Sequence, residues 1–156
     1  MAVIGAGQQA PGHKVGLCCV EIYPLMSGGK LPSQEILDAV LAKCSPDDVR
    51  PLTANVSVHA PQTVCYNLEL AYWIDRENAT RVIAIRDALE TATRGWMTWQ
   101  RSRLGRDINP SELISRMVTA GAKRVEITSP VFTILNAAEL AVPENISILY
   151  GGLEDG

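Results

Sequence analysis

The sequence lacks the features by which membrane and secreted proteins are usually recognised. Among its 156 residues no apolar run approaches the roughly 20 residues that a membrane-spanning helix needs. The N-terminus carries no positively charged segment followed by an apolar one, which is the pattern of a secretory signal. These absences predict a chain that is made and kept in the cytosol, or built into a particle there.

An excess of charge of one sign is also lacking. The chain has 14 lysines and arginines against 17 aspartates and glutamates, a net charge of -3. Such a balance produces no field that would attract nucleic acid, so binding to DNA or RNA is not expected. The remaining composition, 47% hydrophobic and 20% charged, is that of a globular domain that folds without a metal or disulfides.

The cysteines form no recognisable thiol or metal site. Cys18 and Cys19 are adjacent on a predicted strand, so their side chains point to opposite faces and cannot share one metal. The sequence contains no C-x-x-C pair, and His59 with Cys65 would supply only two of the four ligands of a typical structural zinc site. We therefore expect reduced, structural cysteines, with neither a metal nor a Cys–His catalytic site.

A nucleotide site and an acid–base pair are not expected either. The segment 5–10 fits G-x-G-x-x-A, the dinucleotide fingerprint, which requires a strand before it and a helix after it. Only four residues precede Gly5, and Pro11 and Gly12 would break the helix where it must begin. The carboxylates are scattered and form no spaced pair. The sequence thus predicts a protein that is not an enzyme and uses no cofactor.

The first half of the chain alternates between extended and helical patterns. Residues 1–14, rich in small residues, are predicted to be a flexible lead-in, and 15–25 a strand that is apolar on both faces. Helical spacing of apolar residues predicts a helix over 33–44. Alternation then predicts strands at 56–60 and 66–74, and the short spacer between them favours a hairpin.

A long helix is predicted over 78–103. Its apolar residues are spaced 3, 4, 3, 4 and 3 apart and end with Trp96 and Trp99. Such a helix would be about 39 Å long, whereas strands of eight residues span about 27 Å. The end that carries both tryptophans is therefore expected to overhang the sheet.

Turn and cap residues follow this helix. Gly105 suits the left-handed position just past its end. Asn109, Pro110 and Glu112 read as the N-cap, the first residue and the capping-box glutamate of a second helix, which Gly121 ends. This pattern predicts a pair of helices joined by a defined turn.

The last elements complete an α+β fold. Strands are predicted up to Pro130 and over 146–150, with a tail at 153–156. The order βαββααββ predicts a ferredoxin-like split βαβ core, with a mostly antiparallel sheet and helices on one face. We expect residues 15–152 to form a single domain.

Aromatic and basic residues gather around the end of the long helix. An interface between proteins is one explanation, because tryptophan and arginine most often anchor such interfaces. The alternative is that the tryptophans belong to the core and the arginines stabilise the helix C-terminus. The residues that we consider interface candidates are Trp96, Trp99, Arg101, Arg103 and Arg106.

Four segments, in order, resemble the C-terminal part of the baseplate assembly protein J family of contractile-tail bacteriophages. They are Val49–Thr53, Trp99–Ser111, Gly121–Pro130 and Tyr150–Gly152. The first contains Arg50 and Pro51, which we expect to position the strand that follows. Members of the family usually carry a further N-terminal region, so we expect this chain to be a fragment, a single domain or a shortened relative.

The resemblance implies a structural component of the baseplate wedge, located in the virion tail and made in the cytoplasm of the host bacterium. Its implied partners are other wedge proteins, and contacts between copies of the chain are a further expectation. The resemblance implies no catalytic residues and no nucleic acid, membrane or small-molecule partner. Two alternatives remain open: a small enzyme or ligand-binding module on a ferredoxin-like fold, and an oligomerising module unrelated to phage.

Overall fold

A computed structural model describes residues 2–4, 19–44 and 55–155. The chain forms two compact units, each of which draws on more than one segment. Unit 1 comprises Met1–Thr63, Ser102–Arg106 and Leu135–Leu140, and unit 2 comprises Val64–Arg101, Asp107–Ile134 and Ala141–Gly156. The range 15–152, which the sequence predicts to be a single domain, includes parts of both units, and the single domain stays a prediction.

Unit 1 contains a three-stranded sheet in the order β1-β2-β3. Strand β1 (Ala2–Ile4) pairs antiparallel with β2 (Cys19–Tyr23), and β2 pairs parallel with β3 (Asn55–Val58). Helix α1 (Gln34–Cys44) lies between β2 and β3 in the sequence and packs against β3. This is the connection that a parallel pair requires, because parallel strands cannot be joined by a tight turn.

Unit 2 is built on a second three-stranded sheet, in the order β5-β4-β6. Strand β4 (Gln62–Asp75) is central, and β5 (Arg124–Ser129) pairs antiparallel with it. Strand β6 (Glu139–Glu154) lies on the other side of β4. From Cys65 onward, buried residues of β4 alternate with exposed or half-buried ones, as expected for a strand with one covered face.

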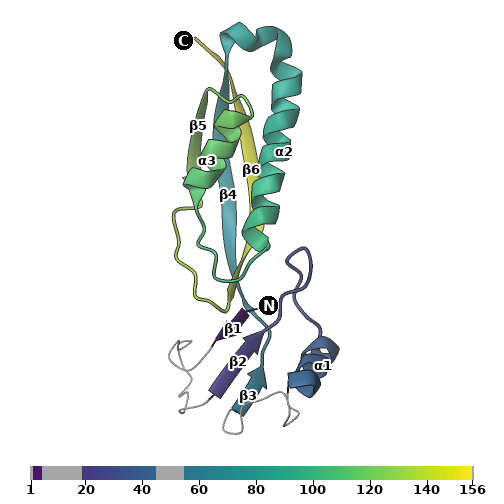
Figure 1. The fold of residues 1–156 in the computed structure, drawn as a ribbon. Helices are drawn as coiled ribbons and strands as arrows, with labels where there is room; N and C mark the ends of the chain where they lie inside the picture. The colour runs from purple at the N-terminus through teal and green to yellow at the C-terminus, as the bar shows by residue number, and fades with distance from the viewer. Residues whose placement is uncertain (1, 5–18, 45–54, 156) are drawn as a thin grey trace. The chain divides into compact units, whose positions relative to one another are not determined.

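Strand β6 runs parallel to β4. The side-chain amide of Asn145 donates to Oδ1 of Asn67 at 3.1 Å, and the rings of Tyr150 and Tyr72 have centroids 5.5 Å apart. Both pairs have the same offset along the sequence, as parallel neighbours do. Both strands also run toward the same end of unit 2 in Figure 1. Each sheet therefore contains one antiparallel and one parallel pair.

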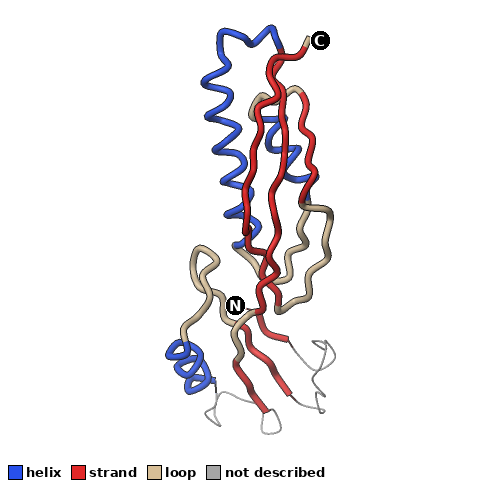
Figure 2. Tube along the Cα trace, turned by 180° about the vertical axis from the view of Figure 1, so that it is seen from behind, coloured by secondary structure: helices blue, strands red, loops and turns tan. Residues whose placement is uncertain are grey.

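Two helices cover one face of the sheet in unit 2, and Figure 2 shows its strands from the opposite side. A 3₁₀ segment, η1 (Arg76–Arg81), leads from β4 into α2 (Val82–Arg101), and α3 (Pro110–Thr119) packs against both α2 and β5. The helices bury residues that repeat every three or four positions. These residues are Ile85, Leu89, Thr93, Trp96, Gln100, Leu113 and Met117.

The predicted α+β class is confirmed, but the ferredoxin-like arrangement is not, because the described strands form two sheets instead of one. The predicted hairpin is wrong: β3 pairs with β2, while β4 pairs with β5 and β6. The mostly antiparallel sheet is corrected to two mixed sheets. Period-two alternation shows which face of a strand is buried and says nothing about which strand lies beside it.

Candidate interaction surfaces

Trp96 lies in the core of unit 2. It is 0% exposed, and its ring meets the Tyr66 ring edge-on, with centroids 5.7 Å apart and planes at 76°. The predicted overhang rests on strands of eight residues, but β4 has 14 and spans about 46 Å. Helix α2, with 20 residues, spans only about 30 Å. The sheet is therefore long enough to cover the helix, and Trp96 presents no surface to a partner.

Trp99 is half-buried and joins the two helices. The guanidinium carbon of Arg116 lies 5.1 Å from the centroid of its ring. Arg116 in turn donates from Nε to Oε1 of Glu112 at 2.9 Å. A cation placed over an indole in this way is worth about 0.5 to 1 kcal/mol when it is exposed to solvent. Trp99 thus stabilises the helix pair and still leaves part of its surface accessible.

The three arginines of the prediction are divided between the two units. Arg101 is the last residue of α2 in unit 2 and is half-buried. Arg103 and Arg106 belong to unit 1, where Arg103 is exposed and Nη1 of Arg106 donates to Oγ of Ser102 at 3.0 Å. We therefore treat the predicted cluster as two separate surfaces, one on each unit.

Gly105 has a backbone conformation that few other residues adopt. Its φ is +63°, and its N–H donates to the carbonyl of Glu139 at 2.9 Å. A Cβ at this position would lie 3.0 Å from Cα of Ala137. Gly105 is therefore suited to its turn both by φ and by the lack of space for a side chain.

Helix α3 begins and ends at special residues. Oδ1 of Asn109 accepts the N–H of Ser111 at 3.0 Å, and Pro110 is the first residue of the helix. Glu112 lies in the first turn, where its carboxylate pairs with Arg116. Gly121, just past the end, has a φ of +115°.

Gly121 also sets how closely the helices approach, because a Cβ there would lie 3.1 Å from Cγ2 of Ile85 in α2. The other two residues expected to position the chain, Arg50 and Pro51, lie outside the described residues.

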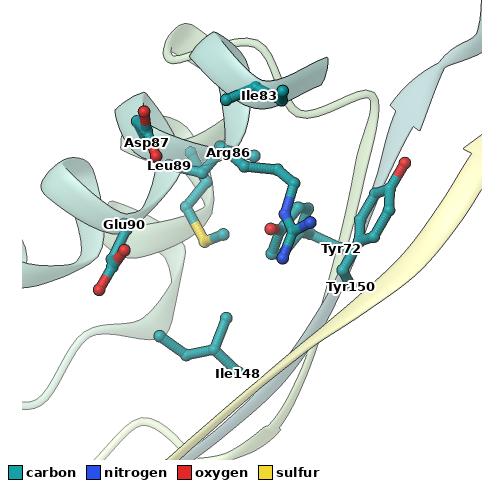
Figure 3. A pocket seen from close by; sticks show the side chains of 9 residues that line it. Tyr72, Ile83, Arg86, Asp87, Leu89, Glu90, Ile148 and Tyr150 are labelled. Atoms are coloured by element: carbon teal, nitrogen blue, oxygen red, sulfur yellow. The ribbon is translucent and has the colours of Figure 1, made fainter. Parts of the chain in front are cut away.

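A cavity of about 360 Å³ lies between α2 and the sheet of unit 2 (Figure 3). Its floor is formed by the buried residues Tyr72, Leu89 and Met117. At one side the guanidinium of Arg86 lies 4.9 Å from the centroid of the Tyr150 ring. The described residues that line the cavity include no histidine, cysteine, serine or lysine, and its polar lining consists of tyrosines, two carboxylates and the Arg86 guanidinium.

The sequence alone does not predict this cavity. Its wall on α2 includes Ile83, an apolar residue outside the buried stripe of the helix. The only indication of the cavity in the sequence was this apolar residue on the otherwise polar face of the helix. It could not be interpreted without knowing that β6 lies opposite.

The opposite face of the same sheet carries a second cluster that joins all three strands. The guanidinium of Arg124 in β5 lies 3.6 Å from the centroid of the Trp73 ring in β4. Arg124 also pairs with Glu126 and, at 3.1 Å, with Glu154 of β6. A Cβ on Gly151 would lie 2.3 Å from Cε2 of Trp73, so a glycine is needed where the indole crosses β6.

In the part of the chain that the structure describes, no three histidine, cysteine, aspartate or glutamate residues come together as a metal site would require. None of the helices described there is long and apolar enough to cross a membrane.

Comparison with known proteins gives the family. The Baseplate J-like central domain matches residues 3–60, and the Baseplate J-like protein C-terminal domain matches residues 66–149. The boundary between these matches falls where β4 passes from unit 1 to unit 2. Baseplate protein J of Escherichia phage P2 is 27% identical over 139 residues, which is 88% of this chain and 45% of the relative. The chain thus spans just under half of the length of that relative, and it belongs to the Baseplate J-like family.

Proposed function

We propose that the chain is a structural component of a phage contractile-tail baseplate and acts through contacts with other wedge proteins in the virion tail. The observation that supports this most is the succession of two Baseplate J-like domains along the chain, in the order central then C-terminal. The relationship to Baseplate protein J of Escherichia phage P2 supports the same role. We place assembly in the cytoplasm of the host bacterium.

The construction of unit 2 is consistent with a part that transmits position between neighbours. Helix α3 is capped by Asn109 and packs closely on α2 at Gly121. Trp99 and Arg116 connect the two helices a second time. A helix pair that is held at several points moves as one body, and this is what a repeated assembly unit requires.

We propose Trp99 and Arg101 as interface residues on unit 2, and Arg103 and Arg106 as interface residues on unit 1. All four keep exposed or half-exposed surface. Tryptophan and arginine bind strongly at interfaces because they combine a large apolar area with hydrogen-bond donors. Trp96 is left out of this proposal because it has no exposed surface.

The proposal is tested by assembling the chain with its neighbouring wedge proteins and measuring the mass of the complex by analytical ultracentrifugation. Trp99→Ala and Arg103→Ala are each expected to weaken association by about tenfold or more, which is the effect of removing an interface anchor. Arg81→Ala is the matched control, because Arg81 is an exposed arginine of η1 outside the proposed surfaces. Its association should equal that of the wild type.

Thermal unfolding distinguishes a lost interface from a lost fold. Trp99→Ala should remain folded at the assay temperature, since it loses a cation–π contact worth about 1 kcal/mol and part of the packing of the helices. Trp96→Ala should cost about 3 to 5 kcal/mol, as expected for a fully buried aromatic residue. If Trp99→Ala and Arg103→Ala assemble as well as the Arg81→Ala control, the proposed interface is wrong.

A further inference from the structure

Strand β6 has one edge without a strand partner among the described residues. In its sheet it neighbours only β4. It is 16 residues long, and every residue from 144 to 149 is exposed. The backbone N–H and C=O groups along such an edge can pair with another strand. The edge is therefore available for strand addition.

The exposed part of β6 lacks the usual protection of an edge strand. Native edges are commonly interrupted by charged residues or proline. Pro143 stands before this segment, but residues 145–149 carry no charge. Three large apolar side chains are exposed there: Ile146 at 51%, Ile148 at 38% and Leu149 at 64%. An uncharged, apolar edge of this kind favours pairing with an apolar strand.

The groove beside this edge can receive side chains from such a strand. Ile148 points into the cavity between β6 and α2, and Ile83 stands on the opposite wall (Figure 3). Ile146 lies two residues from Ile148 and thus on the same face of β6. Ile83 is 78% exposed, although the floor beneath it is buried and apolar. The groove therefore has apolar surface on both walls that nothing in the described chain covers.

The rim of the groove carries charges of both signs. The guanidinium of Arg86 is stacked on Tyr150, and Glu90 pairs with Arg94. Asp87 is exposed, and its carboxylate makes no ion pair or hydrogen bond with another described side chain. Arg86 keeps its positive charge, and the Asp87 carboxylate is placed to form a local ion pair with a basic side chain of a partner.

We propose that an extended segment of a partner protein docks here, adding to the free edge of β6 as a further strand and filling the groove. Its alternate residues are apolar, because they must cover Ile146, Ile148 and Ile83. One lysine or arginine among them meets Asp87. An extended segment fits better than a helix, since only a strand satisfies the unpaired backbone groups of β6. The proposal goes beyond the baseplate role and does not depend on it.

The test uses a fluorescein-labelled peptide of sequence VTVTKTVTV and measures its binding to the full chain by fluorescence anisotropy. The control peptide has the same side chains, with the amides of one edge N-methylated so that they cannot donate to β6. We expect the first peptide to bind saturably and the control to bind about tenfold or more weakly, because backbone pairing provides affinity in strand addition.

Two variants locate the site. The double variant Ile146→Thr and Ile148→Thr should weaken binding by about tenfold, because it removes apolar surface from the groove. It should still fold, since both residues are partly exposed and threonine favours strands. Asp87→Lys should weaken binding by about threefold to fivefold, and a peptide with glutamate in place of its lysine should recover that loss. Val118→Thr, on the exposed side of α3, is the matched control and should bind normally.

Several results would overturn the proposal. These are the absence of peptide binding, equal binding to the wild type and the double variant, and equal binding of the N-methylated peptide. A further contradictory result could come from sedimentation of the chain alone. If the chain self-associates and the double variant does not, the occupant of the groove is a second copy of the chain. None of these measurements uses wedge proteins. A negative result would therefore rule out the docking site on β6 without bearing on the proposed baseplate function.

Discussion

The two edges of the sheet in unit 2 are built differently. On β5, Arg124 lies over Trp73 and pairs with Glu126 and Glu154, and α3 packs against the strand. On β6, residues 145–149 carry no charge and expose three large apolar side chains. One edge thus has the charged residues that discourage pairing with other chains, and the other does not.

The difference indicates that a partner would bind unit 2 at the β6 edge of its sheet and not at the β5 edge. Both edges belong to one sheet and share the central strand β4, so a general need for stability does not explain why they differ. Leaving an apolar edge open favours aggregation unless a partner covers it. If the β5 edge resists pairing with other strands and the β6 edge accepts it, variants of the two edges should behave differently.

The largest effect is expected for Gly151→Ala. The new Cβ would lie 2.3 Å from Cε2 of Trp73, whose ring is also covered by Arg124. The clash should lower the free energy of unfolding by about 3 kcal/mol, as overpacking does. Gly95→Ala is the control, because no atom lies within 4 Å of its new Cβ in α2. It should raise the free energy of unfolding by about 1 kcal/mol, and urea denaturation measures both.

A smaller effect is expected for Arg124→Gln, which opens the closed edge. The melting temperature should fall by less than it does for Gly151→Ala, because Arg124 is half-exposed and its ion pairs are partly screened by solvent. The variant should also begin to self-associate at high concentration, as light scattering can show. Arg81→Gln, at an exposed site outside the sheet, should do neither. A variant that stays monomeric at every concentration would show that Arg124 does not protect β5.

A still smaller effect on stability is expected for Ile146→Lys, which gives the open edge a charge. Because Ile146 is 51% exposed, the free energy of unfolding should change by no more than about 0.5 kcal/mol. Solubility should increase, since the lysine interrupts the uncharged segment. A loss of about 2 kcal/mol or more in urea denaturation would instead place Ile146 in the core and contradict an open edge.

The last effect is expected mainly at alkaline pH, for Tyr66→Phe on the strand between the two edges. Burial raises the pKa of Tyr66 to about 12, against a smaller opposing effect of Arg101. The unfolded chain therefore loses this proton near pH 10 while the folded chain keeps it, so the free energy of unfolding should fall as the pH rises from about 10 to about 12.

Tyr66→Phe should remove this contribution to the alkaline fall. Near pH 7 it should change stability by no more than about 1 kcal/mol, because the hydroxyl has no hydrogen-bond partner among the described residues. Thermal unfolding of both proteins at pH 7 and at pH 11 provides the comparison. Equal pH dependence of the two would show that the hydroxyl is not buried.

Much of the local structure could be predicted from the sequence. The spacing of Ile85, Leu89 and Trp96 indicates the buried stripe of α2, and Asn109 followed by proline indicates the start of α3. These signals are readable because a helix repeats within a few residues and its caps bond to their own neighbours. The family could also be recognised, from four short segments that follow one another in the expected order.

The candidate surfaces were less predictable. Trp96 and Trp99 share a helical stripe, but one is fully buried and the other half-buried. The difference depends on how far β4 and its neighbours extend, and strand length is a weak signal in the pattern. The cavity beside β6 joins residues from β4, α2, α3 and β6, so no single stretch of the chain could reveal it.

The amino-acid sequence alone determined where helices begin, which faces are apolar and which family the chain belongs to, because those properties depend on near neighbours or on short segments. Tertiary structure alone decided which strands are neighbours, which tryptophan is buried and which strands form the edges of the sheets. These depend on pairing between segments that are distant in the chain, such as β4 with β6. The backbone groups that form such pairs are the same in almost every residue, so side-chain pattern cannot specify the partner.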